Sequence, residues 1–127
     1  MDPNVETATE QEFLAITNAF LATSNALGDA IRAIKRIEQT TFDVDEARNL
    51  MKARQELETE AAINERTYAA YCDQTVALHT PTQDQIDEIV QLAGQVAVLT
   101  QKADTAEAIL TITNKIVSEF KDIVLGQ

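Results

Sequence analysis

The sequence predicts an all-α fold: an antiparallel, up-down bundle of long helices packed in a coiled-coil-like manner. Apolar residues recur at alternating spacings of three and four over long stretches, which is typical of amphipathic helices that pack side by side. Only three Gly and two Pro occur in 127 residues, so turns are few and the elements between them are long. This length favours a single domain that covers residues 1–127.

The first helix is expected over residues 9–39, after a flexible N-terminus at 1–8. Thr9 and Glu12 have the spacing of a capping box, in which each side chain bonds the backbone N–H of the other residue. From Phe13 to Ile37 the apolar positions alternate by three and four over about four heptads. This pattern predicts one long helix.

The second helix is expected over residues 43–79. Asp43 and Glu46 repeat the capping spacing, and Pro81 is expected to end the helix because proline disfavours helical geometry in the residue before it. Arg54 and Asn64 interrupt its apolar stripe. Polar residues there either fix the packing register or mark a helix that is only partly covered, and the second interpretation is preferred.

The third helix is expected over residues 82–125, with Thr82 as its N-cap. No Gly or Pro interrupts it from Gln95 to Leu125, which favours one continuous helix of about 65 Å, against about 45 Å for the first. Asp104 and Glu107 have capping spacing again, so the alternative is four helices with a break near Asp104. A continuous helix leaves an apolar end that a second subunit must cover, whereas a break folds that end back.

The net charge of −11 comes from 21 acids and 10 bases. It argues against nucleic acid as a partner, because phosphate binding needs a basic surface, and it permits a basic protein partner. No run of about 18 apolar residues occurs, so no membrane span is expected. The acidic start of the chain is unlike a signal peptide. The cytoplasm is the predicted compartment, with signal-independent secretion left open.

Charge is missing from three stretches of the chain. Residues 13–28 and 89–101 carry none, and residues 67–80 carry only Asp73. Short loops between antiparallel helices would bring these stretches to one end of the bundle. A solvent-facing helix surface is usually charged, so an uncharged one is compatible with burial against another protein. The alternative is a chance drift of composition.

Eight residues from this end and from the C-terminal apolar stripe are the candidate partner interface: Thr17, Phe20, Ser24, Gln91, Gln95, Val117, Phe120 and Val124. A group of acidic residues adjoins them at the starts of the first and third helices: Asp2, Glu6, Glu10, Glu12, Asp84, Asp87 and Glu88. Compensation of helix dipoles explains acids in a first turn. A docking edge for a basic partner is the alternative.

Residues that could support catalysis or metal binding have simpler explanations. His79 is the only histidine, and a di-iron bundle needs Glu three residues before each His, where this chain has Val76. His79 is expected to compensate the dipole at the end of the second helix. Cys72 has no cation beside it in the sequence and is expected to be a small buried side chain. We therefore predict no catalytic, metal or cofactor site.

The sequence thus favours a non-enzymatic helical-bundle protein that acts through protein–protein contacts, as a self-associating or assembly subunit. The alternative is an acidic inhibitor, immunity or adaptor protein that binds a basic protein partner. Solution mass separates the two, because an inhibitor would be monomeric at every concentration.

Overall fold

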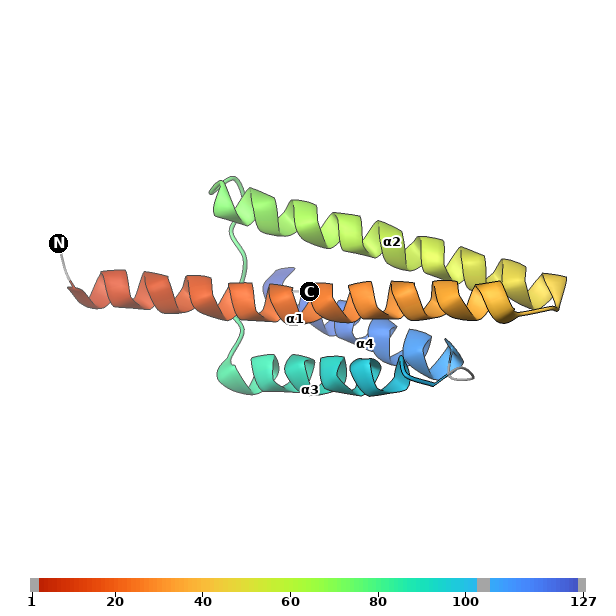
Figure 1. Ribbon diagram of the computed structural model, residues 1–127. Helices are drawn as coiled ribbons and strands as arrows, with labels where there is room; N and C mark the ends of the chain where they lie inside the picture. The colour runs from red at the N-terminus through yellow and green to blue at the C-terminus, as the bar shows by residue number, and fades with distance from the viewer. Residues whose placement is uncertain (1–2, 103–105, 126–127) are drawn as a thin grey trace.

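Four helices make up the described part of the chain (Figure 1). The computed structural model describes the backbone of residues 3–102 and 106–125, and the side chains of residues 10–102 and 106–124. The helices are α1 (Pro3–Thr40), α2 (Val44–Cys72), α3 (Gln83–Leu99) and α4 (Ala106–Leu125). The predicted all-α up-down bundle is confirmed, in its four-helix form. None of the described helices is long and apolar enough to cross a membrane.

The central element of the bundle is α1, which contacts the other three helices. Helices α2 and α3 lie on opposite sides of α1, and no described Cα atom of one comes within 8 Å of the other (Figure 1). Helix α4 packs between α1 and α3 and touches α2 only lightly. α1 and α3 run in one direction and α2 and α4 in the other. The α2 side of α4 is therefore the loosest seam of the bundle.

The core forms where α1, α3 and α4 meet. The fully buried large side chains include Ile16, Leu27 and Ile34 of α1, Ile89 of α3, and Ile109, Ile116 and Val124 of α4. On α4 the buried positions are 109, 113, 116, 120 and 124, which is the spacing of one helical face. From α2 only Leu50, Leu57 and Asn64 are buried. The preferred interpretation of its weak stripe, a helix only partly covered, agrees with this burial.

α1 begins earlier than the sequence predicts. It starts at Pro3, so residues 3–8 are helical rather than a flexible N-terminus, and Thr9 is not the N-cap. Proline is favoured in the first helical turn, where its missing N–H would have no intrahelical acceptor. Glu10 and Glu12 consequently lie beyond the first turn, and dipole compensation does not explain them.

α2 ends earlier than predicted, at Cys72 rather than at 79. The N–H groups of Asp73 and Gln74 bond carbonyls of the last turn, and Gln74 turns the chain with a φ of 61°. The linker then crosses α1 to reach α3 (Figure 1). His79 lies in this linker, seven residues after the end of α2. The expectation that it compensates the dipole at the end of the second helix is therefore wrong. The backbone N–H of His79 donates to the carbonyl of Val124 at 2.8 Å, in the last turn of α4.

The prediction of one continuous third helix is wrong. α3 ends at Leu99 with Thr100 as its C-cap, and the guanidinium of Arg36 on α1 donates to the Thr100 carbonyl. Asp104, the predicted break point, lies outside the described residues. Helix α4 returns along α1 and α3, so its apolar stripe enters the core of the same chain. The predicted overhang is absent from the described helices.

Candidate functional site

The uncharged stretches of α1 and α2 pack against each other. The Tyr68 ring stacks on Phe20 with ring centroids 4.1 Å apart, and its hydroxyl is 2.8 Å from the hydroxyl of Thr17. Closer to the start of α1 and the end of α2, Phe13 and Tyr71 stack with ring centroids 6.2 Å apart. Burial, and then the charge of Glu12, raise the pKa of the Tyr71 phenol. Absence of charge in these stretches therefore reflects in part the contact between α1 and α2.

Most of the predicted interface residues lie inside the bundle. Phe20, Phe120 and Val124 are buried in the core. Val117 and Ser24 are half-buried, and so is Thr17, whose hydroxyl is already bonded to Tyr68. None of these six offers a fully exposed side chain to a partner.

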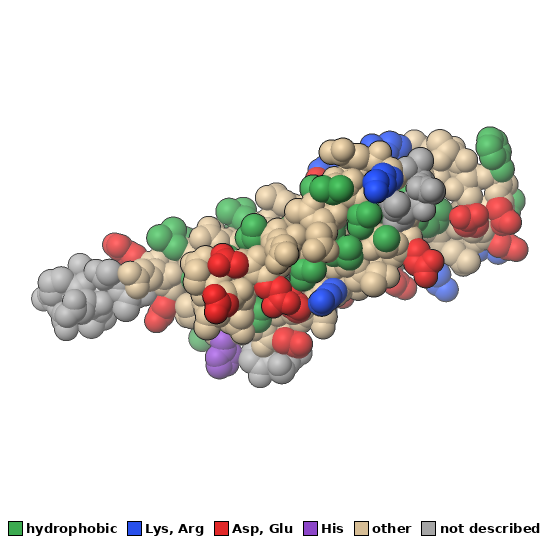
Figure 2. All heavy atoms as spheres, turned by 90° about the horizontal axis from the view of Figure 1, so that it is seen from below, with side chains coloured by type: hydrophobic (Ala, Val, Ile, Leu, Met, Phe, Trp, Pro, Cys, Tyr) green, Lys and Arg blue, Asp and Glu red, His purple; other side chains and the backbone are tan. Residues whose placement is uncertain are grey.

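Gln91 and Gln95 are both exposed, and they lie on the part of the outer face of α3, from Val90 onward, that carries no charge. We call this surface the α3 face and define it by its exposed residues: Val90, Gln91, Gly94, Gln95, Ala97, Val98 and Gln101. Val90 is 51% and Val98 60% exposed. Between α3 and α4 the α3 face continues into a shallow groove that reaches Leu99 and Ile112. Seen from the side of α3, acidic side chains lie towards both ends of the molecule, and the surface between them is mostly uncharged (Figure 2).

Acidic residues border the start of α3. Asp84 lies in the first turn, as dipole compensation predicts, and Asp87 accepts a hydrogen bond from Gln83. Glu88 faces Glu119 of α4. Burial, and then the charge of Glu88, raise the pKa of the Glu119 carboxyl, while Lys115 opposes this shift.

Arg54, one of the two polar residues on the stripe of α2, joins α2 to α1. Its Nε lies 2.5 Å from Oε2 of Glu38, and its Nη1 lies 2.7 Å from Oε1 of Glu58. These hydrogen bonds raise the pKa of the guanidinium above its ordinary value. The residue is therefore held as a cation at the edge of the α1–α2 contact.

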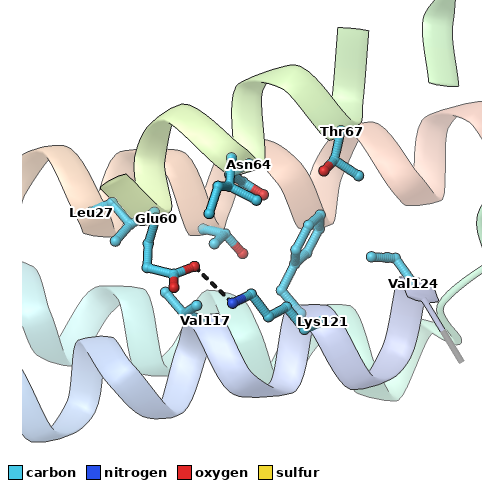
Figure 3. Close-up of a pocket in the computed structure, with 10 residues that line it drawn as sticks. Leu27, Glu60, Asn64, Thr67, Val117, Lys121 and Val124 are labelled. Atoms are coloured by element: carbon cyan, nitrogen blue, oxygen red, sulfur yellow. Dashed lines mark ion pairs between the residues drawn. The ribbon is translucent and has the colours of Figure 1, made fainter. Parts of the chain in front are cut away.

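Asn64, the second polar residue on that stripe, lines a cavity of about 30 Å³ in the seam between α2 and α4 (Figure 3). Thr23 and Leu27 of α1 contribute to its walls. The α4 side is formed by Val117, Phe120, Lys121 and Val124. At its edge Lys121 Nζ lies 2.8 Å from Glu60 Oε2, an ion pair between α4 and α2 (Figure 3).

The side chains with reactive potential lie apart from one another. Cys72 is exposed at the end of α2, so the expectation of a buried cysteine is wrong. Its position in the helix-ending turn explains the error, because the sequence placed that position in mid-helix. The His79 side chain is exposed on the linker. Over the described residues no three His, Cys, Asp or Glu side chains gather as metal ligands would.

No protein-family model, curated protein or solved structure matches this chain.

Proposed function

We propose that this chain is a non-enzymatic helical-bundle protein that acts by protein–protein contact, and that it pairs with a second copy of itself through the α3 face. One observation carries the proposal: the exposed residues from Val90 to Gln101, on α3 and the turn that follows it, bear no charge, in a chain whose net charge is −11. Two copies with that charge repel each other over most orientations. Contact between two α3 faces brings no like charges together at its centre.

The spacing of residues on the α3 face suits a self-complementary contact. Val90, Gly94 and Val98 are four residues apart, so they lie in one row along the helix. A side chain added at Gly94 would meet nothing within 4 Å, so the space outside it is open to an approaching helix. If two α3 helices cross at Gly94 in opposite directions, Val90 of each copy packs on Val98 of the other. A two-fold axis requires this reciprocity.

The expected dimer is weak and reversible. The helical part of the α3 face, residues 90–99, spans roughly 15 Å, which gives a contact near the lower end of interface sizes. The exposed amides of Gln91 and Gln95 flank the row and can bond across the interface. Because its centre is apolar and uncharged, the dimer should persist at high ionic strength.

Solution mass tests the proposal. Sedimentation equilibrium over a wide concentration range should show a monomer–dimer equilibrium for the unaltered chain. Gln95→Glu should shift this equilibrium strongly towards monomer, because it places two like charges in the contact. Gln55→Glu is the matched control: it adds the same charge at an exposed position of α2 and should leave the dimer intact.

A mass equal to that of a monomer at every concentration would contradict the proposal. It would favour the second candidate, an acidic protein that binds a basic partner. That candidate draws on the exposed acids on the N-terminal half of α1 and the start of α3: Glu10, Glu12, Asp84, Asp87 and Glu88. Binding of this kind should weaken steeply as salt is added.

A further inference from the structure

The cavity between α2 and α4 contains a buried hydrogen-bond donor that lacks an acceptor. Asn64 is only 7% exposed, and its Nδ2 atom has no partner among the described residues. The amide lies on the inner side of α2, facing α4 across the seam (Figure 3). Buried polar atoms are nearly always bonded, to protein or to an ordered water. A ligand that accepts a hydrogen bond would therefore satisfy the buried amide of Asn64.

An acceptor stands on the same face of α2. Glu60 precedes Asn64 by four residues, which makes the two side chains neighbours on the helix surface. The Oε2 atom of Glu60 is shielded from solvent, and its one described partner is the ammonium of Lys121. A carboxylate oxygen can accept a second hydrogen bond. A group that fits between these two residues accepts from Asn64 and donates to Glu60, and a hydroxyl does both.

The remaining walls are mainly apolar. Leu27, Phe120 and Val124 surround the space on the sides of α1 and α4. A volume of about 30 Å³ holds roughly two or three water-sized groups, since one water needs about 10–15 Å³. Ethanol has three heavy atoms, one of them a hydroxyl oxygen.

We propose that this cavity is a binding site for a small hydroxyl compound, either water or a short-chain alcohol. The hydroxyl bonds Asn64 and Glu60, and the carbon atoms of an alcohol contact Phe120 and Val124. This site lies in the α2–α4 seam, lined by none of the residues of the α3 face. The proposal consequently stands or falls independently of self-association.

Nuclear magnetic resonance on the full chain tests the proposal, with ethanol as the probe. Ethanol should shift the Asn64 side-chain amide and the Val124 methyl signals along a saturable curve, with a dissociation constant of about a millimolar or weaker for so small a ligand. If ethanol produces only a linear solvent effect, a cross-peak between the Asn64 amide and a long-lived water identifies water as the occupant. The proposal is overturned if neither the saturable ethanol response nor the water cross-peak is seen.

Two comparisons establish the chemistry of the site. Acetonitrile also has three heavy atoms, and it accepts a hydrogen bond but cannot donate one to Glu60, so it should bind roughly tenfold more weakly than ethanol. This comparison uses the unaltered protein and does not depend on a variant's folding. Equal binding of acetonitrile would remove Glu60 from the site and overturn the proposed hydroxyl selectivity.

Asn64→Leu should abolish the saturable response, or the water cross-peaks of the cavity if water is the occupant. Asn49→Leu is the matched control, because Asn49 is exposed on the same helix and far from the cavity. It should leave the response unchanged. Retention of ethanol binding in Asn64→Leu would overturn the assignment of Asn64 as the donor.

Discussion

Tyr68 of α2 lies flat against Phe20 of α1, with ring planes 7° apart. The same phenol bonds the Thr17 hydroxyl across the same contact. One residue therefore supplies both an apolar surface and a polar bond to α1, at a level where α2 buries few other side chains.

Tyr68→Phe should preserve the stacked rings and remove the bond to Thr17. We expect the free energy of unfolding to fall by about 0.5–1.5 kcal/mol, the usual net value of one hydrogen bond. Urea denaturation measures this loss. Thr17→Val should cost a similar amount, and the double variant should cost much less than the sum of the two. Full additivity would mean that the two hydroxyls do not interact.

Thr113→Val should stabilise the protein. Thr113 is completely buried on α4, and its hydroxyl has no hydrogen-bond partner within the described ranges. A methyl group of the same size removes that unsatisfied group, which costs roughly 1–3 kcal/mol when left buried. We expect the free energy of unfolding, measured by thermal or urea denaturation, to increase by about 1 kcal/mol. Thr111→Val, at an exposed position of the same helix, is the control; a drop in stability for Thr113→Val would show that its hydroxyl is bonded after all.

Gln74→Gly should also stabilise the protein, for a reason that lies in the backbone. Gln74 adopts a φ of 61° just after α2, a conformation that glycine enters without strain. We expect a gain of up to roughly 1 kcal/mol, because relief of strain outweighs the greater freedom of glycine in the unfolded chain. Gln74→Val should have the opposite effect, since a β-branched side chain tolerates this conformation least. Thermal unfolding checks both variants: the melting temperature of Gln74→Gly should lie above that of the unaltered protein, and that of Gln74→Val below it.

Glu119→Gln should stabilise the protein at neutral pH and lose this advantage in acid. The folded state raises the pKa of Glu119, through burial and the charge of Glu88. The folded chain therefore binds this proton more tightly than the unfolded chain does. The protonated Glu119 carboxyl contributes stability that is fully present below the ordinary glutamate pKa. This stability is lost as the pH rises through the higher pKa that Glu119 has in the folded state.

The gain at neutral pH should be less than about 1 kcal/mol, because partly exposed carboxylates interact weakly. Melting temperatures of the two proteins, recorded from neutral to acidic pH, should converge as Glu119 becomes protonated. Glu107→Gln, at an exposed position near the start of the same helix, provides the comparison. If the difference in melting temperature between Glu119→Gln and the unaltered protein stays constant with pH, the titration of Glu119 is not its source.

Periodicity predicts the all-α class, the antiparallel order of the helices and most of the buried positions of α1 and α4. The reason is that burial of one helix face dictates the spacing of apolar residues. Helix ends were predicted less well. The capping residues Asp43 and Thr82 act locally and were identified correctly. The end of α2 at Cys72 depends on the turn at Gln74, and neither Gly nor Pro marks that position in the sequence.

The exposure of the candidate interface residues could be predicted only in part, since exposure depends on which helices pack together. Gln91 and Gln95 are exposed because α3 turns only its other face to α1 and α4. Phe120 and Val124 are buried because the chain folds back after Leu99. Asn64 was recognised as a polar residue on an apolar stripe, but its unpartnered amide and the cavity in front of it require a structure to be seen.

The central place of α1 has a consequence for the order of events on the ribosome. Its neighbours in the core, α3 and α4, are the last helices to be made, because α1 ends at Thr40 and α4 ends at Leu125. At about 5–20 residues per second, translation leaves roughly 4–17 s between those two points. In the first part of this interval, before α3 is made, the apolar face of a nascent α1 has only α2 to cover it, so a chaperone would find its binding surface on this helix.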